Sequence, residues 1–202
     1  MLYCNILMRK FIDRRNRARL KNREFSLFSS NCNGACICHD LGLPFRSPFV
    51  NLWMTAPDFV KLMRAPREYL AAPLEFPDQT EYPYPVARLR DVSLYFEHYK
   101  TEQEARELWN RRTARLNWNN LFVLMSDRDG CTEEVLQAFD ALPYRNKVIF
   151  THTPRPDIAS AVYIPGFEKD GQVGVCSEFK NGWSGKKWYD HFDYVTWFNK
   201  GK

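Results

Sequence analysis

The chain lacks several features that define common protein classes. No run of apolar residues approaches the roughly 20 that a membrane-spanning helix needs. The Gly-rich phosphate loop of many nucleotide-hydrolysing enzymes is absent, as is the G-x-G-x-x-G fingerprint of dinucleotide-binding domains, so neither class is supported. There is no internal repeat and no low-complexity segment. What remains is a chain of 202 residues with 45% hydrophobic and 26% charged residues, as in ordinary soluble globular proteins.

Cysteine is too sparse and too unevenly placed for a disulfide framework. The six cysteines stand at positions 4, 32, 36, 38, 131 and 176. Secreted domains that depend on disulfides are smaller and denser in cysteine, whereas free thiols fit a reducing compartment. A signal peptide is not expected, because the short apolar run at the start of the chain precedes the charges instead of following them. We therefore expect a cytoplasmic protein.

The body of the chain also lacks basic charge. The net charge is +5, but residues 1–24 alone carry +6, which leaves −1 for the rest. A nucleic-acid-binding domain should hold its basic residues on its own fold, so no nucleic-acid partner is expected. In the arm, Leu7, Phe11 and Ile12 follow helical spacing among arginines. Such a basic amphipathic helix either lies on the anionic inner face of a membrane or packs loosely, as a solvated arm, on the domain.

Strand and helix patterns alternate along the remaining chain. Apolar or alternating runs predict strands at residues 25–30, 47–55, 120–126, 146–152 and 160–167, and one long strand or a hairpin at 86–99. Helices are expected after the turn at 31–34, at 58–70 with an interruption at Pro66, after the turn at 127–132, and at 185–199. A further helix at 101–117 begins with a capping box formed by Thr101 and Glu104.

These patterns predict an α/β domain. Strand 120–126, the helix after it and strand 146–152 form a βαβ unit, which implies a parallel pair and a right-handed crossover. The continuous apolar run at 120–126 is typical of a central strand covered on both faces. We expect a mostly parallel central sheet with helices on both faces, in three α/β/α layers. It would form one domain over residues 25–202, preceded by a basic helical arm over residues 1–24.

Several stretches resemble, in order, the motifs of a bacterial domain family of unknown function. They are FSLFSSNCNGA, SPFVNLWM, DFVKLM, YPVARLRDVSLYFEHYKTEQEARELWNRR, NWNNLFVLMSDRDGCTEE, FDALPYRNKVIFTH and VYIPGF. Members of this family are commonly labelled exopolysaccharide biosynthesis proteins, and the resemblance runs from about residue 24 to the C-terminus. In relatives the turn after the first strand usually has Asn-Cys-Trp-Gly-Gly, so Cys32 and Gly34 keep that pattern. The resemblance implies an α/β fold and a role in surface polysaccharide, and it implies no particular catalytic residues.

Cys32 is the first candidate for chemistry. It stands where a strand breaks into a tight turn before a helix, and free amides at a helix N-terminus lower the pKa of a thiol. The same amides, with Asn31, Asn33 and Gly34, are suited to bind a phosphate without covalent chemistry. The alternative is a cysteine that packs under the turn. Zinc is not expected, because the four candidate ligands Cys32, Cys36, Cys38 and His39 lie within eight residues and would have to enclose the ion alone.

Further candidates follow the other strands. Asp127 and Asp129 come directly after strand 120–126 and supply the oxygen ligands that Mg²⁺ or Mn²⁺ prefers; alternatively they serve only the turn, with Asp129 capping the next helix. His152 ends strand 146–152. In a parallel sheet these residues and Cys32 share one edge, where α/β proteins bind ligands. Arg111 and Arg115 either meet a phosphate or form a solvated helix face.

Three functions fit this pattern. The first is a transferase of exopolysaccharide biosynthesis that acts on a sugar or sugar nucleotide. Cys32 and His152 would serve as nucleophile and base or as donors to an anion, while Asp127 and Asp129 would hold a divalent cation or a sugar hydroxyl. The second is a non-catalytic accessory protein of polysaccharide assembly. The third is a cysteine-dependent hydrolase with Cys32, His152 and Asp127 as its triad.

Overall fold

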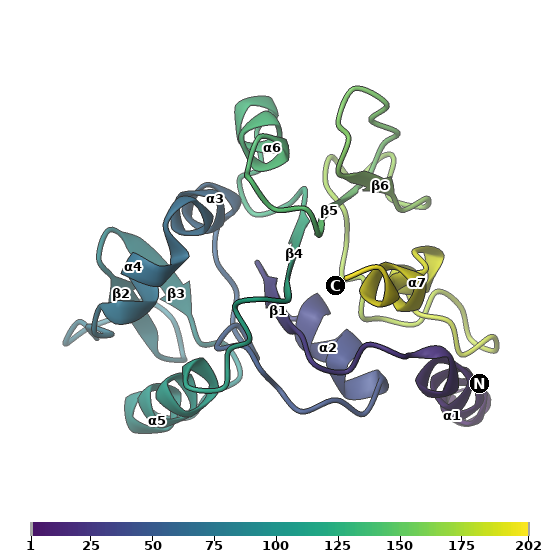
Figure 1. Cartoon of the computed structure of the whole chain (residues 1–202), viewed down its shortest axis with the longest axis horizontal. Coiled ribbons are helices and arrows are strands. Elements are labelled where there is room, and N and C mark those ends of the chain that lie inside the picture. Colours follow the sequence, from purple (N-terminus) through teal and green to yellow (C-terminus); the bar gives the residue numbers. More distant parts are fainter. Residues whose placement is uncertain (1, 202) are drawn as a thin grey trace.

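A four-stranded parallel sheet organises the chain (Figure 1). The computed structural model describes residues 2–201, with side chains from residue 4 onward, so the outermost positions of the expected arm and domain, residues 1 and 202, lie outside it. The strands are β1 (Ser26–Ser29), β4 (Leu121–Ser126), β5 (Lys147–Thr151) and β6 (Ala161–Tyr163). They lie in the order β1-β4-β5-β6 and all neighbours are parallel. The prediction of an α/β fold with a mostly parallel sheet is confirmed.

The βαβ unit forms as its sequence pattern predicts. Helix α6 (Glu133–Asp140) connects β4 to β5, and Val123 of β4 lies opposite Lys147 of β5. The helix begins after Thr132, whose hydroxyl accepts a hydrogen bond from the amide of Val135 at 3.4 Å. Thr132 is therefore the N-cap, a role for which threonine is well suited. The expected alternative, in which Asp129 caps this helix, is wrong.

A long insertion separates β1 from β4. It contains α2 (Asn33–Asp40), α3 (Ala56–Arg64), α4 (Pro66–Ala71), the antiparallel hairpin β2 (Val86–Leu89) and β3 (Val92–Tyr95), and α5 (Glu102–Thr113). The strand expected at 47–55 does not form. Asn51 has a φ of 60°, which ends any extended run, and only Trp53 makes a single antiparallel bridge, to Tyr95. The segment instead carries the chain from α2 to α3.

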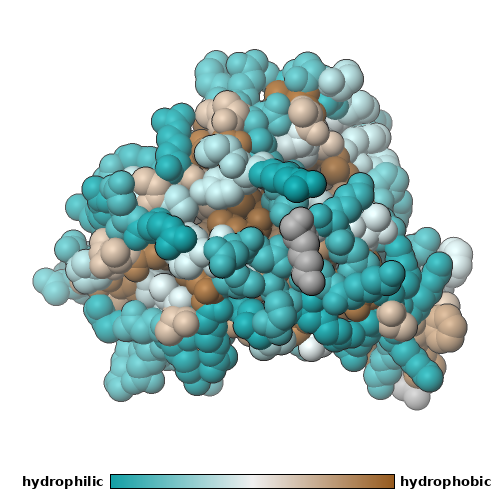
Figure 2. Space-filling model, in the orientation of Figure 1, coloured by the Kyte–Doolittle hydropathy of each residue, from teal (hydrophilic) through white to brown (hydrophobic). Residues whose placement is uncertain are grey.

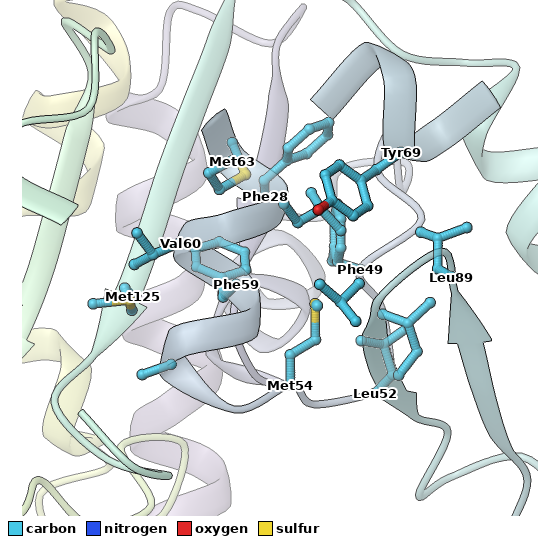
Figure 3. Close-up of a cluster of buried hydrophobic side chains, with 14 of the residues drawn as sticks. Phe28, Phe49, Leu52, Met54, Phe59, Val60, Met63, Tyr69, Leu89 and Met125 are labelled. Atoms are coloured by element: carbon cyan, nitrogen blue, oxygen red, sulfur yellow. The ribbon is translucent and has the colours of Figure 1, made fainter. Parts of the chain in front are cut away.

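Alternate strand residues enter two different hydrophobic clusters, because neighbouring side chains on a strand point to opposite faces. One cluster joins the sheet to α3, α5, α6 and the hairpin, and part of it is shown in Figure 3. The other joins the sheet to α2 and to α7 (Tyr194–Asn199). Phe28, Val123 and Met125 belong to the first cluster, and Leu27, Phe122 and Leu124 to the second. Apolar packing therefore covers the sheet from both sides.

The end of the chain is less helical than its sequence pattern predicts. Within the expected helix at 185–199, the structure has a short 3-10 helix, η1 (Trp188–His191), followed by α7. Asp193 explains the interruption, because its carboxylate accepts a hydrogen bond from the amide of Thr196 at 3.2 Å and so starts a new helix. Phe192, between the two helices, has an extended backbone.

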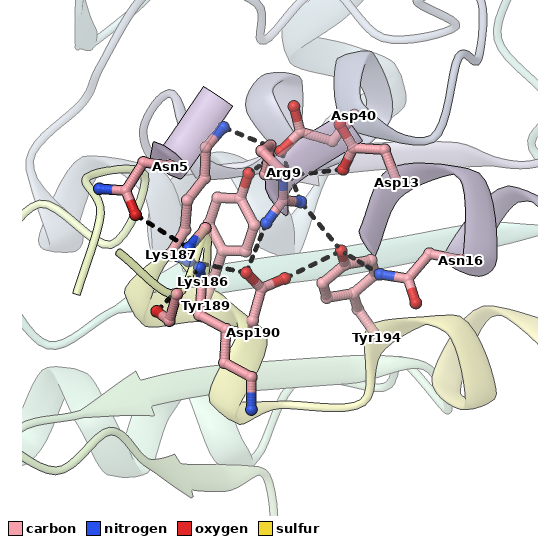
Figure 4. A network of polar contacts seen from close by, with 12 residues as sticks. Asn5, Arg9, Asp13, Asn16, Asp40, Lys186, Lys187, Tyr189, Asp190 and Tyr194 are labelled. Atoms are coloured by element: carbon pink, nitrogen blue, oxygen red, sulfur yellow. Dashed lines mark hydrogen bonds and ion pairs between the residues drawn. The ribbon is translucent and has the colours of Figure 1, made fainter. Parts of the chain in front are cut away.

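The basic arm forms helix α1 (Leu2–Arg19), which lies beside α7 and η1 (Figures 1 and 4). Arg9 is only 6% exposed and forms ion pairs with Asp13 at 2.7 Å, Asp40 at 2.8 Å and Asp190 at 2.5 Å. The side chain of Asn5, also buried, donates to the carbonyl of Asn181 and accepts from the amide of Gly185. The arm is therefore held by buried polar contacts, and the loosely packed, solvated arm, one of the two alternatives predicted from the sequence, is not what the structure has. No helix within residues 2–201 is long and apolar enough to cross a membrane.

Candidate functional site

Two asparagines connect the carboxyl ends of β1 and β4. The side-chain amides of Asn31 and Asn33 donate to the hydroxyl of Ser126 at 3.2 and 3.3 Å. The Asn31 side chain also accepts a hydrogen bond from the amide of Asn33 at 3.1 Å, which shapes the turn between β1 and α2. These contacts fix both asparagines at the edge of the sheet, as expected from the sequence.

Gly34 is required where it stands. Its amide donates to the hydroxyl of Ser29 at 3.2 Å, and a Cβ at this position would lie 2.6 Å from the Cβ of Ser29. Only a residue without a side chain lets the first turn of α2 approach β1 so closely. Gly34 thus has a packing role, and it is buried beneath the site.

Cys32 occupies the N-cap position of α2, but its thiol is not activated. Its side chain makes no capping hydrogen bond, and its Sγ donates weakly to the carbonyl of Leu52 at 3.8 Å. Burial, with a smaller contribution from the neighbouring Cys36 and Glu97, raises the pKa of the Cys32 thiol to about 12. The sequence predicted a lowered pKa from the helix N-terminus, and the surroundings of the thiol produce the opposite shift.

Cys32 and both asparagines line a hollow of about 570 Å³, the Trp53 hollow. Trp53 and Tyr84 form an aromatic wall among the residues that line it. The charged and polar lining residues are Glu97, Asp129, Glu178, His98 and Arg128. The Trp53 ring stacks on Tyr95 with centroids 3.9 Å apart and planes at 7°, so its position is fixed. Sequence patterns missed the aromatic wall, because it comes from the segment expected as a strand and from the loop before β2.

Asp127 and His152 form a close pair at the next strand boundary. Asp127 Oδ2 lies 2.6 Å from His152 Nδ1 and accepts a hydrogen bond from the His152 amide at 2.8 Å. Asp127 Oδ1 accepts another from the amide of Val173 at 2.8 Å. The convergence of these two residues was expected, because β4 and β5 are adjacent and parallel.

The pair lines a separate small hollow, the His152 hollow of about 140 Å³, together with Cys131 and Arg155. Cys32 does not line it. The structure therefore does not bring the expected Cys32, His152 and Asp127 triad together in one hollow. Cys131, which the sequence analysis passed over, shares the hollow with the histidine; its position in the loop that follows β4 was the available signal.

Asp127 and Asp129 do not meet as a cation site. Asp127 lines the His152 hollow, whereas Asp129 lines the Trp53 hollow and contacts the Arg128 side chain at 3.1 Å. Asp129 has a φ of 57° and Gly130 a φ of 83°, so this pair makes the turn after β4, where both residue types are favoured. Among the described residues, no three His, Cys, Asp or Glu side chains gather as metal ligands.

Arg111 and Arg115 lie away from both hollows. Both are exposed, Arg111 near the end of α5 and Arg115 just beyond it. The chain passes from there to the amino end of β4, which is the opposite edge of the sheet from Asn31. Neither arginine lines the Trp53 hollow or the His152 hollow.

The fold and the site define an α/β protein with one ligand-sized hollow, the Trp53 hollow, at the carboxyl edge of a parallel sheet, the usual binding edge of this class. The chain belongs to the family described as a domain of unknown function (DUF1919), whose model matches residues 3–199. This match includes α1, whereas the motifs recognised in the sequence placed the start of the family region near residue 24. The chain is also similar to an "Uncharacterized protein" of Haemophilus influenzae. The two are 52% identical over 195 residues, which cover 96% of this chain and 94% of that protein. Neither description supports the exopolysaccharide label.

Proposed function

We propose that this protein binds a sugar or sugar nucleotide in the Trp53 hollow and acts as a transferase in surface-polysaccharide biosynthesis. The observation that carries the proposal is the combination of a fixed aromatic wall with amide and carboxylate groups at the strand ends. A volume of about 570 Å³ is that of a typical ligand site. The proposal treats the sheet and its helices as a three-layer α/β/α domain, whose ligands bind at the carboxyl edge.

The lining suits the two surfaces of a sugar. One face of a sugar ring is made of C–H groups and packs on an aromatic ring such as Trp53, while its hydroxyl groups need donors and acceptors. Asn31 and Asn33 supply amides, and Glu97 and Glu178 supply carboxylates. Paired carboxylates are also the usual acid and base of sugar transfer. Cys32 stands on the wall as a packing group, because its thiol is protonated at neutral pH.

A diphosphate would complete this site. Arg128 supplies a guanidinium group to the lining of the Trp53 hollow, and guanidinium groups bind phosphate oxygens through two parallel hydrogen bonds. A magnesium or manganese ion would bind together with the diphosphate, with Asp129 as its protein ligand, because such ions take part of their shell from substrate phosphates. The free protein should then bind the ion weakly.

Calorimetric titration of UDP-sugars, with and without manganese, tests the proposal. The change Trp53→Ala should weaken binding about tenfold or more, because it removes the stacking surface. Trp183→Ala is the matched control, since Trp183 is 69% exposed and does not line the hollow. If no UDP-sugar binds under either condition, the proposal fails and the accessory role in polysaccharide assembly is favoured. Equal losses in both variants would place the site elsewhere.

A cysteine-dependent hydrolase is the second candidate, favoured by the contact between Asp127 and His152. A carboxylate at Nδ1 leaves Nε2 of the imidazole to act as a base, as in catalytic triads. Burial, with smaller contributions from Asp127 and Glu133, raises the pKa of the Cys131 thiol to about 12. The thiol would therefore attack a carbonyl carbon only as His152 accepts its proton. A burst of nitrophenol from a nitrophenyl ester should disappear in Cys131→Ser and persist in Cys32→Ser; no burst in the unmodified protein excludes this candidate.

We also propose that α1 holds the protein at the inner face of a membrane. Leu7 is 51% exposed and Phe11 69% exposed on this helix, next to exposed basic residues such as Lys10, Arg14 and Arg15. Figure 2 has apolar colours at the end of the molecule that α1 occupies in Figure 1. An apolar stripe within basic charge is suited to anionic lipid.

Sedimentation with phosphatidylglycerol vesicles tests this attachment. The double change Leu7→Ser with Phe11→Ser should abolish it, whereas Val175→Ser, which alters a side chain 47% exposed away from α1, should not. Failure of the unmodified protein to sediment with the vesicles would refute the attachment and leave the sugar site unaffected.

A further inference from the structure

A third hollow, the Trp118 hollow, lies at the opposite edge of the sheet. Its volume is about 650 Å³, and it is lined by the junction of α3 with α4 and by the segments that enter β4 and β5. Those segments lead into the amino ends of parallel strands, whereas the Trp53 hollow lies at the carboxyl ends. The six residues of β4 separate the two by roughly 20 Å. A ligand in one hollow therefore does not touch the other.

The Trp118 hollow is strongly basic. Arg64, Arg67, Arg145 and Lys200 line it, and the one acidic lining residue is Glu68. Glu68 pairs with an arginine outside the hollow, at 3.1 Å. Among the residues that the structure describes, none of these basic side chains forms an ion pair. Positive charges concentrated around a concave surface repel one another and focus a positive potential into it.

One of these cations is held in place. The guanidinium carbon of Arg67 lies 4.3 Å from the ring centroid of Trp118, a cation–π contact. The Trp118 ring in turn packs edge-on against Phe28 of the core, with centroids 5.9 Å apart. Stacking on an aromatic ring leaves the N–H edge of a guanidinium available for other partners. Arg67 is therefore preorganised to receive an anion.

We propose that the Trp118 hollow is a second binding site, and that its ligand carries a diphosphate group. Guanidinium groups from the α3–α4 junction and from the loop before β5 approach the same space, so one phosphoryl group cannot satisfy them all, whereas two linked groups can. The volume exceeds that of a single phosphate ion. Free pyrophosphate and the diphosphate of a nucleotide share this chemistry, and the site is independent of the sugar site at Trp53.

Calorimetry with pyrophosphate at low salt tests this site. Arg67→Gln with Arg145→Gln should weaken binding about tenfold or more, the loss expected for two charge-assisted contacts. Arg111→Gln with Arg115→Gln is the matched control, because it removes the same charge from exposed arginines outside the hollow, and it should change the dissociation constant less than about twofold. If the first variant does not fold, Arg145→Gln alone serves, because this side chain is exposed and its replacement should not disturb the core.

Two further comparisons separate the ligand sources and the two proposals. Uridine without phosphate should not bind at this site. If UDP binds with the affinity of pyrophosphate, the diphosphate is the group that is recognised. If UDP binds far more tightly, the site also recognises a nucleoside. Arg128→Gln removes the guanidinium proposed to hold a diphosphate in the Trp53 hollow, and it should leave pyrophosphate binding unchanged, so the two sites fail independently. The inference is overturned if pyrophosphate does not bind the unmodified protein, or if both arginine pairs cause the same loss.

Discussion

Asp127 Oδ2 lies 2.6 Å from His152 Nδ1 and accepts a hydrogen bond from the backbone amide of the same histidine. The second carboxylate oxygen of Asp127 accepts a hydrogen bond from the amide of Val173. One buried carboxylate at the end of β4 therefore connects the end of β5 to the chain that follows β6. Its removal should affect stability as well as any chemistry of the histidine.

Asp127→Asn should lower the free energy of unfolding by about 1–3 kcal/mol, because the NH2 group that replaces one carboxylate oxygen cannot accept the hydrogen bond that this oxygen accepted from a backbone N–H. Asp129→Asn is the matched control, since asparagine tolerates the left-handed backbone at that position, and it should cost less than about 0.5 kcal/mol. Urea unfolding measures both. Equal stabilities for the two variants would contradict the role of Asp127 as a connector.

Arg9 should be the most costly of the arm residues to replace. Arg9→Met leaves Asp13, Asp40 and Asp190 without their shared cation, and breaking a buried pair in this way costs about 3–5 kcal/mol. Arg19→Met removes an exposed pair with Asp193 and should cost less than about 1 kcal/mol. Urea unfolding of both variants would detect this difference, and similar losses would show that burial of the network contributes little.

Deletion of residues 1–22 tests whether residues 25–202 form a domain alone, as the sequence predicts. The buried contacts of Arg9 and Asn5 lead us to expect a loss of about 3 kcal/mol, or a fall in melting temperature of roughly 6–12 °C for a chain of this size. Calorimetry measures the change. An unchanged melting temperature would establish the independent domain, with the arm as an attachment.

Asp40 should make the fold sensitive to acid. Burial raises its pKa, but hydrogen bonds from Tyr189 and Lys187 outweigh this effect, as does the charge of Arg9, so the pKa lies below its usual range. The folded state thus favours the carboxylate. The resulting stability is present above the unfolded pKa of about 3.9 and is lost as the pH falls through the folded value.

The stability lost on Asp40→Asn should therefore be large at pH 7 and should shrink as the pH falls below about 4. The pKa of Asp13 is shifted in the opposite direction, because burial raises it despite the nearby Arg9. Because the charge of Asp40 is one cause of that raised pKa, the comparison is made in an Asp13→Asn background, so that the difference between the two proteins reports on Asp40. Urea unfolding across this pH range measures it, and a loss that does not vary with pH would exclude the titration of Asp40 as its cause.

Alkylation by iodoacetamide should modify Cys4 first, because it is the exposed cysteine. Cys32, which the sequence analysis expected to be the reactive thiol, should react slowly, since burial raises its pKa to about 12 and the thiolate is the nucleophile. Mass spectrometry after timed labelling at pH 8 gives the order. Fast labelling of Cys32 would restore the activated site at the start of α2.

The features that could be predicted from sequence are those set by local pattern. The apolar run of β4 and the capped helices are readable because periodicity and cap chemistry act over a few residues. The meeting of Asp127 with His152 followed from the parallel pairing of adjacent strands. Trp53 and Cys131 were missed because their roles depend on which loops face the same hollow, and no local pattern records that. The prediction of a lowered pKa for Cys32 was wrong for the same reason, because burial by segments distant in the sequence determines that pKa.

The partner of Arg9 in η1, Asp190, follows it 181 residues later in the chain. At a synthesis rate of about 5–20 residues per second, roughly 10–35 s pass between the emergence of the two side chains from the ribosome. Throughout that interval α1 has a basic, partly apolar surface, and the Asp190 carboxylate that pairs with Arg9 has not yet been made. Helix α1 therefore cannot complete its buried contacts until η1 has been made, and for that time its basic side chains are open to any anionic surface.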